Sequence, residues 1–178
     1  MDTNHKICIS ASDIGITVSE IAIMLNIIIK ASDNTSIYVC VMNGAVQFFK
    51  DVTSLLPSGY CHYISASSYK SNSIQTELRL NVPTLPEHYS NESLDIFIFD
   101  DICDTGETLK SIVKEYHRNY PNSCIHTIAL LHRDRHDAVY RPNFRGIHAT
   151  EGSWFAGYGM DNNGLDRNLP YIYIVEDI

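Results

Sequence analysis

The segment from Phe97 to Leu109 constrains the fold and the chemistry of this 178-residue chain more than any other. It begins with an apolar run that is followed by two adjacent carboxylates, Asp100 and Asp101. After two intervening residues comes the loop-like run Asp104-Thr105-Gly106-Glu107-Thr108. Helical spacing then continues through Leu109, Ile112, Val113 and Tyr116. This order predicts a buried strand, a tight loop and a helix N-terminus, where free N–H groups and the helix dipole favour anions. Carboxylates beside such a loop indicate a site for a phosphorylated sugar and a metal ion.

Strand and helix patterns alternate along the rest of the chain. Short apolar runs predict strands at 7–9, 37–42, 60–65, 94–99, 124–131 and 171–175. Apolar residues three and four apart predict helices from Ser10 or Ser12 to about residue 30, from 45 to about 56, and from about 108 to 120. The alternation predicts an α/β fold with a mostly parallel sheet, helices on both faces and ligands at the carboxyl ends of the strands.

Length, charge and cysteine content narrow the class of protein. The chain is expected to form one domain over 1–178, because no linker divides it. A net charge of −8 disfavours nucleic acid, which requires clustered Lys and Arg. The longest apolar stretch, 21–29, contains Asn26 and is too short to span a bilayer, and we expect no secretory signal because no cationic segment precedes an apolar run. Five cysteines without a Cys-x-x-Cys pair indicate reduced thiols and a cytoplasmic protein.

The run from Asp100 to Thr108 resembles the phosphoribosyl diphosphate (PRPP) motif of type I phosphoribosyltransferases. That motif is an apolar run, two acidic residues, two mostly apolar residues and then Asp-Thr-Gly-x-Thr, and every defining position is filled here. A receiver-type phosphoacceptor domain also carries an acidic pair after a strand, but it would place the pair near its start and leave the phosphate loop unexplained. The resemblance implies the type I fold, with a small hood from about 150 to 171 and a mobile lid loop from about 66 to 80.

Two further segments resemble the diphosphate-binding parts of the hypoxanthine-guanine subgroup. Asn43-Gly44 matches a loop in which a Lys-Gly or similar pair commonly takes a cis peptide bond, and Asn43 replaces the frequent Lys. Ser68-Tyr69 matches the Ser-Tyr pair of the family's lid, which covers PRPP and excludes water from the reactive ribose. The resemblance therefore implies diphosphate contacts at Asn43, Gly44, Ser68 and Tyr69.

The C-terminal third resembles the family's purine-binding region. Arg133 follows Leu130-Leu131-His132 where the subgroup carries a Lys that donates to the purine 6-oxygen, and arginine is also a pure donor. By resemblance, Trp154 stacks on the purine, the backbone at Phe155 reads its edge, and Asp161 lies at the purine and supports a second magnesium. The same pattern assigns Arg167 to the diphosphate.

The resemblance implies purine salvage: transfer of 5-phosphoribosyl from PRPP to N9 of a 6-oxopurine, with Mg²⁺ as cofactor. Thr105, Gly106, Glu107 and Thr108, with Asp104, would hold the 5-phosphate, and the Glu107 side chain would point away from it. Asp100 and Asp101 would hold the ribose hydroxyls and magnesium, and Asp104 would act as general acid/base at purine N7. The enzyme is expected to form a homodimer or homotetramer and to bind neither nucleic acid nor membrane.

Two alternatives stay open at this point. The chain could be a type I transferase for another base, with Arg133 and Asn43 altering its selectivity. It could also be a nucleotide-sensing regulator that keeps the PRPP fold and binds RNA. The net charge of −8 argues against RNA binding. The sequence does not rank hypoxanthine, guanine and xanthine as substrates.

Overall fold

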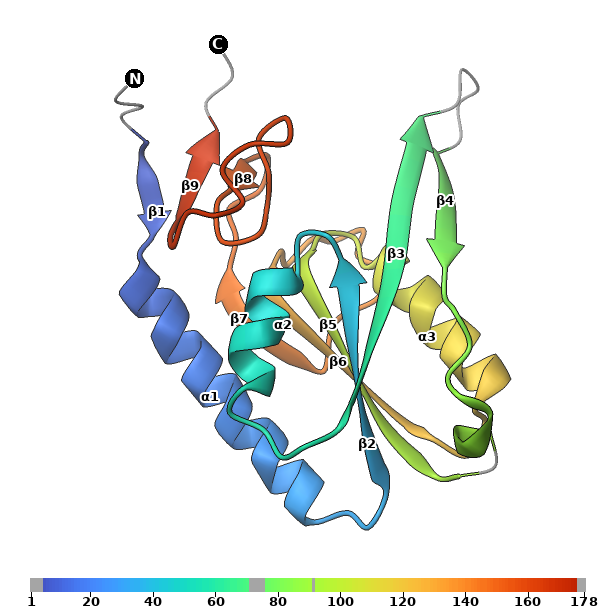
Figure 1. Ribbon diagram of the computed structural model, residues 1–178. Helices are drawn as coiled ribbons and strands as arrows, with labels where there is room; N and C mark the ends of the chain where they lie inside the picture. Colours follow the sequence, from blue (N-terminus) through green and yellow to red (C-terminus); the bar gives the residue numbers. More distant parts are fainter. Residues whose placement is uncertain (1–4, 71–75, 91, 176–178) are drawn as a thin grey trace.

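The computed structural model describes residues 5–70, 76–90 and 92–175, of which 67–70 and 76–79 by their backbone, and it contains two sheets (Figure 1). The larger sheet has six strands in the order β4-β3-β2-β5-β6-β7. Its strands are β2 (Thr35–Met42), β3 (Tyr60–Lys70), β4 (Thr76–Asn81), β5 (Leu94–Cys103), β6 (Cys124–His132) and β7 (Phe144–His148). The smaller sheet is formed by β1 (Ile7–Ile9), β9 (Ile172–Val175) and β8 (Trp154–Ala156), in that order.

The pairing of the larger sheet confirms the predicted mostly parallel arrangement. β3, β2, β5, β6 and β7 pair in parallel, and only the edge strand β4 is antiparallel to its neighbour β3 among the described strands. Parallel strands place their carboxyl ends at one edge of the sheet, so the loops after β2, β5 and β6 meet there. That edge lies below the smaller sheet (Figure 1), and we call this sheet together with residues 150–171 the hood.

Helices cover both faces of the larger sheet, as the continuous apolar strands require. One face of β2 and β5 packs against α1 (Ala11–Lys30) and α2 (Val46–Thr53), and the other face packs against α3 (Glu107–Asn119). Side chains alternate between the two faces because the strand period is two. Tyr38, Cys40, Phe97 and Phe99 therefore belong to the α1/α2 side, while Ile37, Val39, Ile96 and Ile98 belong to the α3 side.

Helix α1 begins at a complete capping box. The Ser10 hydroxyl accepts from the Asp13 N–H at 3.2 Å, and the Asp13 carboxylate accepts from the Ser10 N–H at 3.3 Å. Ile14, Val18, Ile21 and Leu25 bury one stripe of the helix in the core. By length and composition alone α1 would also pass as a membrane-spanning helix, although this stripe packs against α2 and the sheet.

Several strands differ from those expected from the sequence. β3 continues to Lys70 and pairs with β4, so the described flanks of the expected lid are two antiparallel strands, and residues 71–75 lie outside the described residues. β5 continues to Cys103, through the acidic pair. β7 and β8 were not predicted from the sequence, because Phe144–His148 is interrupted by Arg145 and Gly146 and Trp154–Ala156 is only three residues long.

Two neighbouring tyrosines on the α3 side give a matched test of core energetics. The buried Tyr116 hydroxyl has no hydrogen-bond partner among the described residues, whereas the Tyr120 hydroxyl accepts from the Leu85 N–H at 2.8 Å. We therefore expect Tyr116→Phe to leave the free energy of unfolding unchanged or to raise it by up to about 1 kcal/mol. Tyr120→Phe leaves a buried donor unpaired and should lower it by about 1–3 kcal/mol.

Urea denaturation of the two variants and the parent chain measures both effects. Equal destabilisation by the two substitutions would contradict this assignment of the two hydroxyls.

Candidate active site

A cavity of about 570 Å³ opens at the carboxyl edge of the larger sheet, beneath the hood. It is lined by the ends of β2 and β5, the start of α3, the end of β6 and the segment 153–167. Polar lining residues come from each of these elements: Asn43, Asp100, Asp101, Asp104, Thr108, Arg133, Ser153, Asp161 and Arg167. Sequence segments more than 100 residues apart thus contribute to one site.

The acidic pair, Asp100 and Asp101, lies near the carboxyl end of β5, which ends at Cys103. Asp100 is buried, and its carboxylate accepts from the Asp101 N–H at 3.1 Å, while the Asp101 carboxylate accepts from the Ile102 N–H at 3.0 Å. Burial raises the pKa of both carboxyl groups, and for Asp100 the neighbouring Asp101 charge adds to the effect. A cation or hydroxyl donors supplied by a ligand would relieve this repulsion.

The loop after β2 lies directly against this pair. Gly44 approaches so closely that a Cβ there would overlap the Asp101 carboxylate. The cis peptide bond of this loop joins Met42 to Asn43. The expectation from the sequence that the Asn43-Gly44 pair itself holds the cis bond was therefore wrong by one position, because the bond precedes the pair.

The anion loop between β5 and α3 has the backbone geometry expected from its sequence. Gly106 occupies the N-cap of α3 with φ +83°, and a Cβ there would overlap the Tyr140 carbonyl. The Thr105 carbonyl accepts from the Val139 N–H at 2.8 Å, which ties the loop to the segment after β6. Within the described chain the N–H groups of Thr105, Gly106 and Thr108 have no hydrogen-bond acceptor, so they are free to bind an anion.

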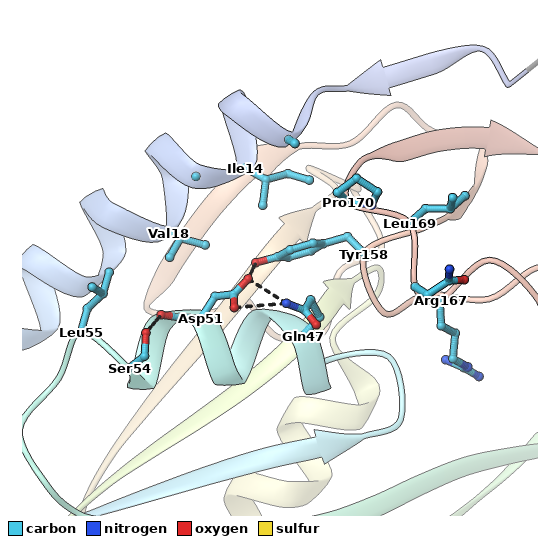
Figure 2. A pocket seen from close by; sticks show the side chains of 13 residues that line it. Ile14, Val18, Gln47, Asp51, Ser54, Leu55, Tyr158, Arg167, Leu169 and Pro170 are labelled. Carbon is cyan, nitrogen blue, oxygen red and sulfur yellow. Dashed lines mark hydrogen bonds between the residues drawn. The ribbon is translucent and has the colours of Figure 1, made fainter.

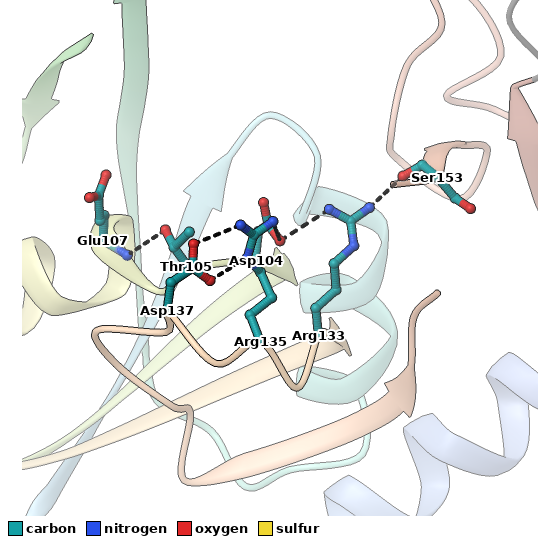
Figure 3. Close-up of polar contacts among 7 residues, drawn as sticks. All are labelled: Asp104, Thr105, Glu107, Arg133, Arg135, Asp137 and Ser153. Atoms are coloured by element: carbon teal, nitrogen blue, oxygen red, sulfur yellow. Dashed lines mark hydrogen bonds and ion pairs between the residues drawn. The ribbon is translucent and has the colours of Figure 1, made fainter. Parts of the chain in front are cut away.

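Asp104 stands between two arginines (Figure 3). Its Oδ1 lies 3.1 Å from Arg133 Nη1 and 3.5 Å from Arg135 Nη1, and Arg135 also pairs with Asp137 at 2.7 Å. The other end of the Arg133 guanidinium donates to the Ser153 carbonyl, while its buried Nε has no partner among the described residues. Figure 3 also shows the Glu107 carboxylate pointing away from this cluster.

The hood supplies an aromatic and a second ion pair. Trp154 is 65% exposed, and its indole donates to the Asp161 carbonyl at 3.4 Å. Phe155 is buried, and the Arg133 guanidinium lies over its ring, with Cζ 5.6 Å from the ring centre. Arg167 donates to the Asp161 carboxylate at 2.6 Å and to the Gly159 carbonyl at 2.7 Å. The Asp161 carboxylate accepts from the Gly164 N–H as well, at 2.8 Å.

A second cavity, of about 480 Å³, lies between α1, α2 and the hood (Figure 2). Inside it the Tyr158 hydroxyl donates to the Asp51 carboxylate at 2.7 Å, and the Gln47 amide donates to the same carboxylate at 3.1 Å. Arg167 lines both cavities. This partly buried bond attaches the turn that carries Tyr158 to α2.

The structure gathers most of the residues that the sequence singled out. The first cavity is lined by Asn43, Gly44, Asp100, Asp101, Asp104, Thr108, Arg133, Trp154, Phe155, Asp161 and Arg167. Thr105, Gly106 and Glu107 adjoin it in the anion loop. The side chains of Ser68 and Tyr69 lie outside the described residues. Sequence reasoning missed Arg135, Asp137, Ser153 and the Asp51–Tyr158 pair; the Arg-x-Arg spacing after β6 was the one available signal, for Arg135.

The described residues contain no cluster of three His, Cys, Asp or Glu side chains that could enclose a metal ion. Magnesium does not require one, since it keeps several waters and is held by one or two carboxylates together with substrate phosphates. The carboxylates of the buried Asp100 and the half-buried Asp101 fit that partial donor set. Asp161 fits it less directly, because Arg167 and the Gly164 N–H already engage its carboxylate.

Comparison with known proteins identifies this architecture. The phosphoribosyl transferase domain matches residues 13–161. Hypoxanthine-guanine phosphoribosyltransferase of Staphylococcus epidermidis is 30% identical over 142 residues, or 79% of this chain and 77% of that protein. Hypoxanthine-guanine-xanthine phosphoribosyltransferase of Tritrichomonas foetus is 26% identical over 99% of this chain and 94% of that protein. The structure of hypoxanthine phosphoribosyltransferase from Trypanosoma cruzi with the product IMP shares the fold, with TM-score 0.80 at 22% identity, covering 99% of this chain and 96% of that one.

The contact between Gly44 and Asp101 predicts a specific sensitivity. Gly44→Ala forces the acidic pair and the β2 loop apart, and overpacking of this kind costs about 1–3 kcal/mol. We expect the affinity for PRPP, measured by calorimetry, to fall by roughly tenfold or more. Gly15→Ala on α1 is the matched control, because an added Cβ there has no atom within 4 Å apart from the neighbouring backbone of the helix itself. Unchanged PRPP affinity in Gly44→Ala would show that this contact does not shape the site.

Proposed function

This chain belongs to the phosphoribosyl transferase family, and we propose that it salvages purines by transferring 5-phosphoribosyl from PRPP to N9 of a 6-oxopurine. The products are the nucleoside 5′-monophosphate and diphosphate. Support for the reaction class comes from relatives that are themselves named hypoxanthine-guanine phosphoribosyltransferases. Hypoxanthine and guanine are the expected bases, with xanthine as a third candidate.

The observation that carries the proposal is the convergence of four recognition elements on one cavity. A free-amide loop at the N-terminus of α3 suits a 5-phosphate, and the acidic pair at the end of β5 suits ribose hydroxyls. Arg133 offers donors for a purine oxygen, and the exposed Trp154 ring offers a stacking surface. A base, a sugar and a phosphate attached in that order would contact all four.

The reaction breaks the C1′–oxygen bond to diphosphate and forms the C1′–N9 bond to the base. Positive charge develops on the ribose ring, and the carboxylates of Asp100 and Asp101, which line the cavity, are proposed to stabilise it. The diphosphate leaves with negative charge, and Arg167 and the Asn43-Gly44 loop, which line the same cavity, are proposed to bind it. Arg167 must release Asp161 or Gly159 to do so, because its guanidinium is engaged with both.

Asp104 is proposed as the general acid/base that takes the proton from the purine at N7. Its carboxylate is half-exposed at the cavity wall and is oriented by Arg133 and Arg135. Magnesium, bound with PRPP near Asp100 and Asp101, would neutralise charge on the diphosphate. Asp161 is proposed to join magnesium or purine binding once Arg167 has moved. Ser68 and Tyr69 are proposed to contact diphosphate from the lid.

Arg133 is proposed to select the base. A guanidinium can only donate, so it accepts the 6-oxygen of hypoxanthine or guanine and leaves the 6-amino group of adenine facing another donor. One end of the Arg133 guanidinium pairs with the Asp104 carboxylate, and the other end donates to the Ser153 carbonyl. The proposed base-reading group and the proposed proton-transfer group are therefore in direct contact.

The alternative of an RNA-binding regulator finds little support in the charges. The segment after β6 concentrates cations, but Arg133 and Arg135 pair with Asp104, while Arg141 and Arg145 lie 3.6 and 3.4 Å from Asp134. The carboxylates of Asp104, Asp134 and Asp137 thus offset most of the charge of these four arginines, and the whole chain carries a net charge of −8. We propose a cytoplasmic homo-oligomeric enzyme that binds neither nucleic acid nor membrane.

An absorbance assay with PRPP and magnesium tests the reaction. Hypoxanthine, guanine and xanthine are offered separately, with adenine as the negative control. We expect turnover of 6-oxopurines and none of adenine, and we expect Asp104→Asn to lower kcat by about 10²- to 10⁴-fold. Absence of turnover with every base, while PRPP still binds, would refute the assignment and leave another base or a regulatory role.

Substitution of Arg133 tests base selection. Arg133→Met removes a charged donor worth about 1.5–3 kcal/mol, so kcat/KM for hypoxanthine should fall by roughly 10- to 100-fold, whereas Arg133→Lys should retain most of it. Arg135→Met is the matched control, because it also frees Asp104 from an arginine but leaves the base-reading donor in place. If Arg135→Met and Arg133→Met lower hypoxanthine turnover equally, Arg133 acts through Asp104 and does not read the base.

A further inference from the structure

Helix α1 carries a second apolar stripe that its own chain does not bury. Ile14, Val18, Ile21 and Leu25 fill the core on one side of the helix. On another side Ile16 is 57%, Ile23 63% and Ile27 64% exposed, and Met24 adjoins them. A surface helix ordinarily presents polar residues there. Exposed apolar side chains gathered on one helix face indicate a binding surface.

The spacing of this stripe is that of a helix–helix seam. Intervals of three and four residues alternate along its whole length: Asp13, Ile16, Glu20, Ile23, Ile27 and Lys30. Such alternation is the a/d pattern along which two helices pack. All six side chains belong to exposed residues, and α1 contacts α2 and β7 with its other faces. In Figure 1 α1 lies along one side of the molecule.

We propose that α1 is a self-association surface, on which α1 of a second copy packs antiparallel about a two-fold axis near Ala22. In this arrangement Ile16 lies opposite Ile27 of the second copy, and Asp13 lies opposite its Lys30. The symmetry repeats both contacts, as an isologous interface requires. Asp13 uses only Oδ2 in the capping box, and within the described chain Oδ1 has no hydrogen-bond partner.

The charges select this direction of packing. A parallel pair would place Asp13 against Asp13, Glu20 against Glu20 and Lys30 against Lys30, whereas the antiparallel pair joins opposite charges at both ends. The antiparallel pair also sets the two helix dipoles head to tail. Glu20 lies opposite Ile23 at the seam, which makes it the one stripe residue that opposes association.

A second copy fits this stripe better than a lipid surface does. Helices that lie in a membrane interface flank their apolar face with Lys and Arg, which anionic lipids attract. The α1 stripe carries Asp13 and Glu20 against the single cation Lys30, on a chain with net charge −8. None of the stripe residues lines either cavity beside the hood. The proposal is therefore independent of the proposed reaction.

Analytical ultracentrifugation of the full chain across a range of concentrations tests the surface. We expect the parent chain to associate, and Ile23→Asp to halve the mass of the assembly while folding remains intact by circular dichroism. Val139→Asp is the matched control, because it places the same charge on another half-exposed apolar side chain, in the loop after β6. Glu20→Gln should tighten association. A monomeric parent chain, or equal mass for Ile23→Asp and the parent, would overturn the proposal.

Disulfide trapping tests the direction, in a background with the exposed Cys8, Cys61 and Cys124 changed to Ser. A mixture of Ile16→Cys and Ile27→Cys chains should form a covalent pair under mild oxidation. Neither variant should do so alone, because like positions lie about 16 Å apart along the helices, beyond the reach of a disulfide. Dimers of Ile16→Cys alone, or no cross-link in the mixture, would overturn the antiparallel arrangement. Binding of monomeric parent chain to phosphatidylcholine vesicles would assign the stripe to lipid instead.

Discussion

The close approach of three chain segments at Gly44 is the constraint on which the rest of the site depends. Gly44 lies against the Asp101 carboxylate, and Gly159, with φ +101°, lies so close to the Gly44 carbonyl that neither position has room for a Cβ. The end of β2 is thereby fitted between the end of β5 and the hood. Arg167, which is proposed to bind diphosphate, donates to the Gly159 carbonyl. The contact between Gly159 and Gly44 therefore lies directly beside Arg167.

Charge compensation organises the remainder of the site. The acidic pair on β5, with Asp100 buried and Asp101 half-buried, has no cation in ion-pair range among the described residues, whereas Asp104 and Asp161 each pair with arginine. This difference fits their proposed partners: the first pair awaits ribose hydroxyls and a metal ion, while the other two carboxylates exchange an arginine for substrate. On this proposal, substrate binding rearranges ion pairs that the site already contains.

Local sequence patterns predicted the helices, the anion loop and strands β1, β2, β5, β6 and β9, because each is fixed by nearby residues. Alternating burial in β2, the capping box at Ser10 and the αL glycine at Gly106 all follow from local chemistry. The pairing of β1 with β9 and the bond between Asp51 and Tyr158 could not be predicted, because they join segments over 100 residues apart. The site residues came from family resemblance, which also placed the cis bond one position late.

The most direct measurement of the central claim is a crystal structure with inosine 5′-monophosphate bound. The account predicts the phosphate on the amides of 105–108, the ribose hydroxyls at Asp100 and Asp101, and the purine on Trp154. It also predicts that Arg133 turns from Asp104 toward the 6-oxygen of the base. A nucleotide bound elsewhere, or one whose base faces away from Arg133 while the Arg133–Asp104 pair stays closed, would contradict it.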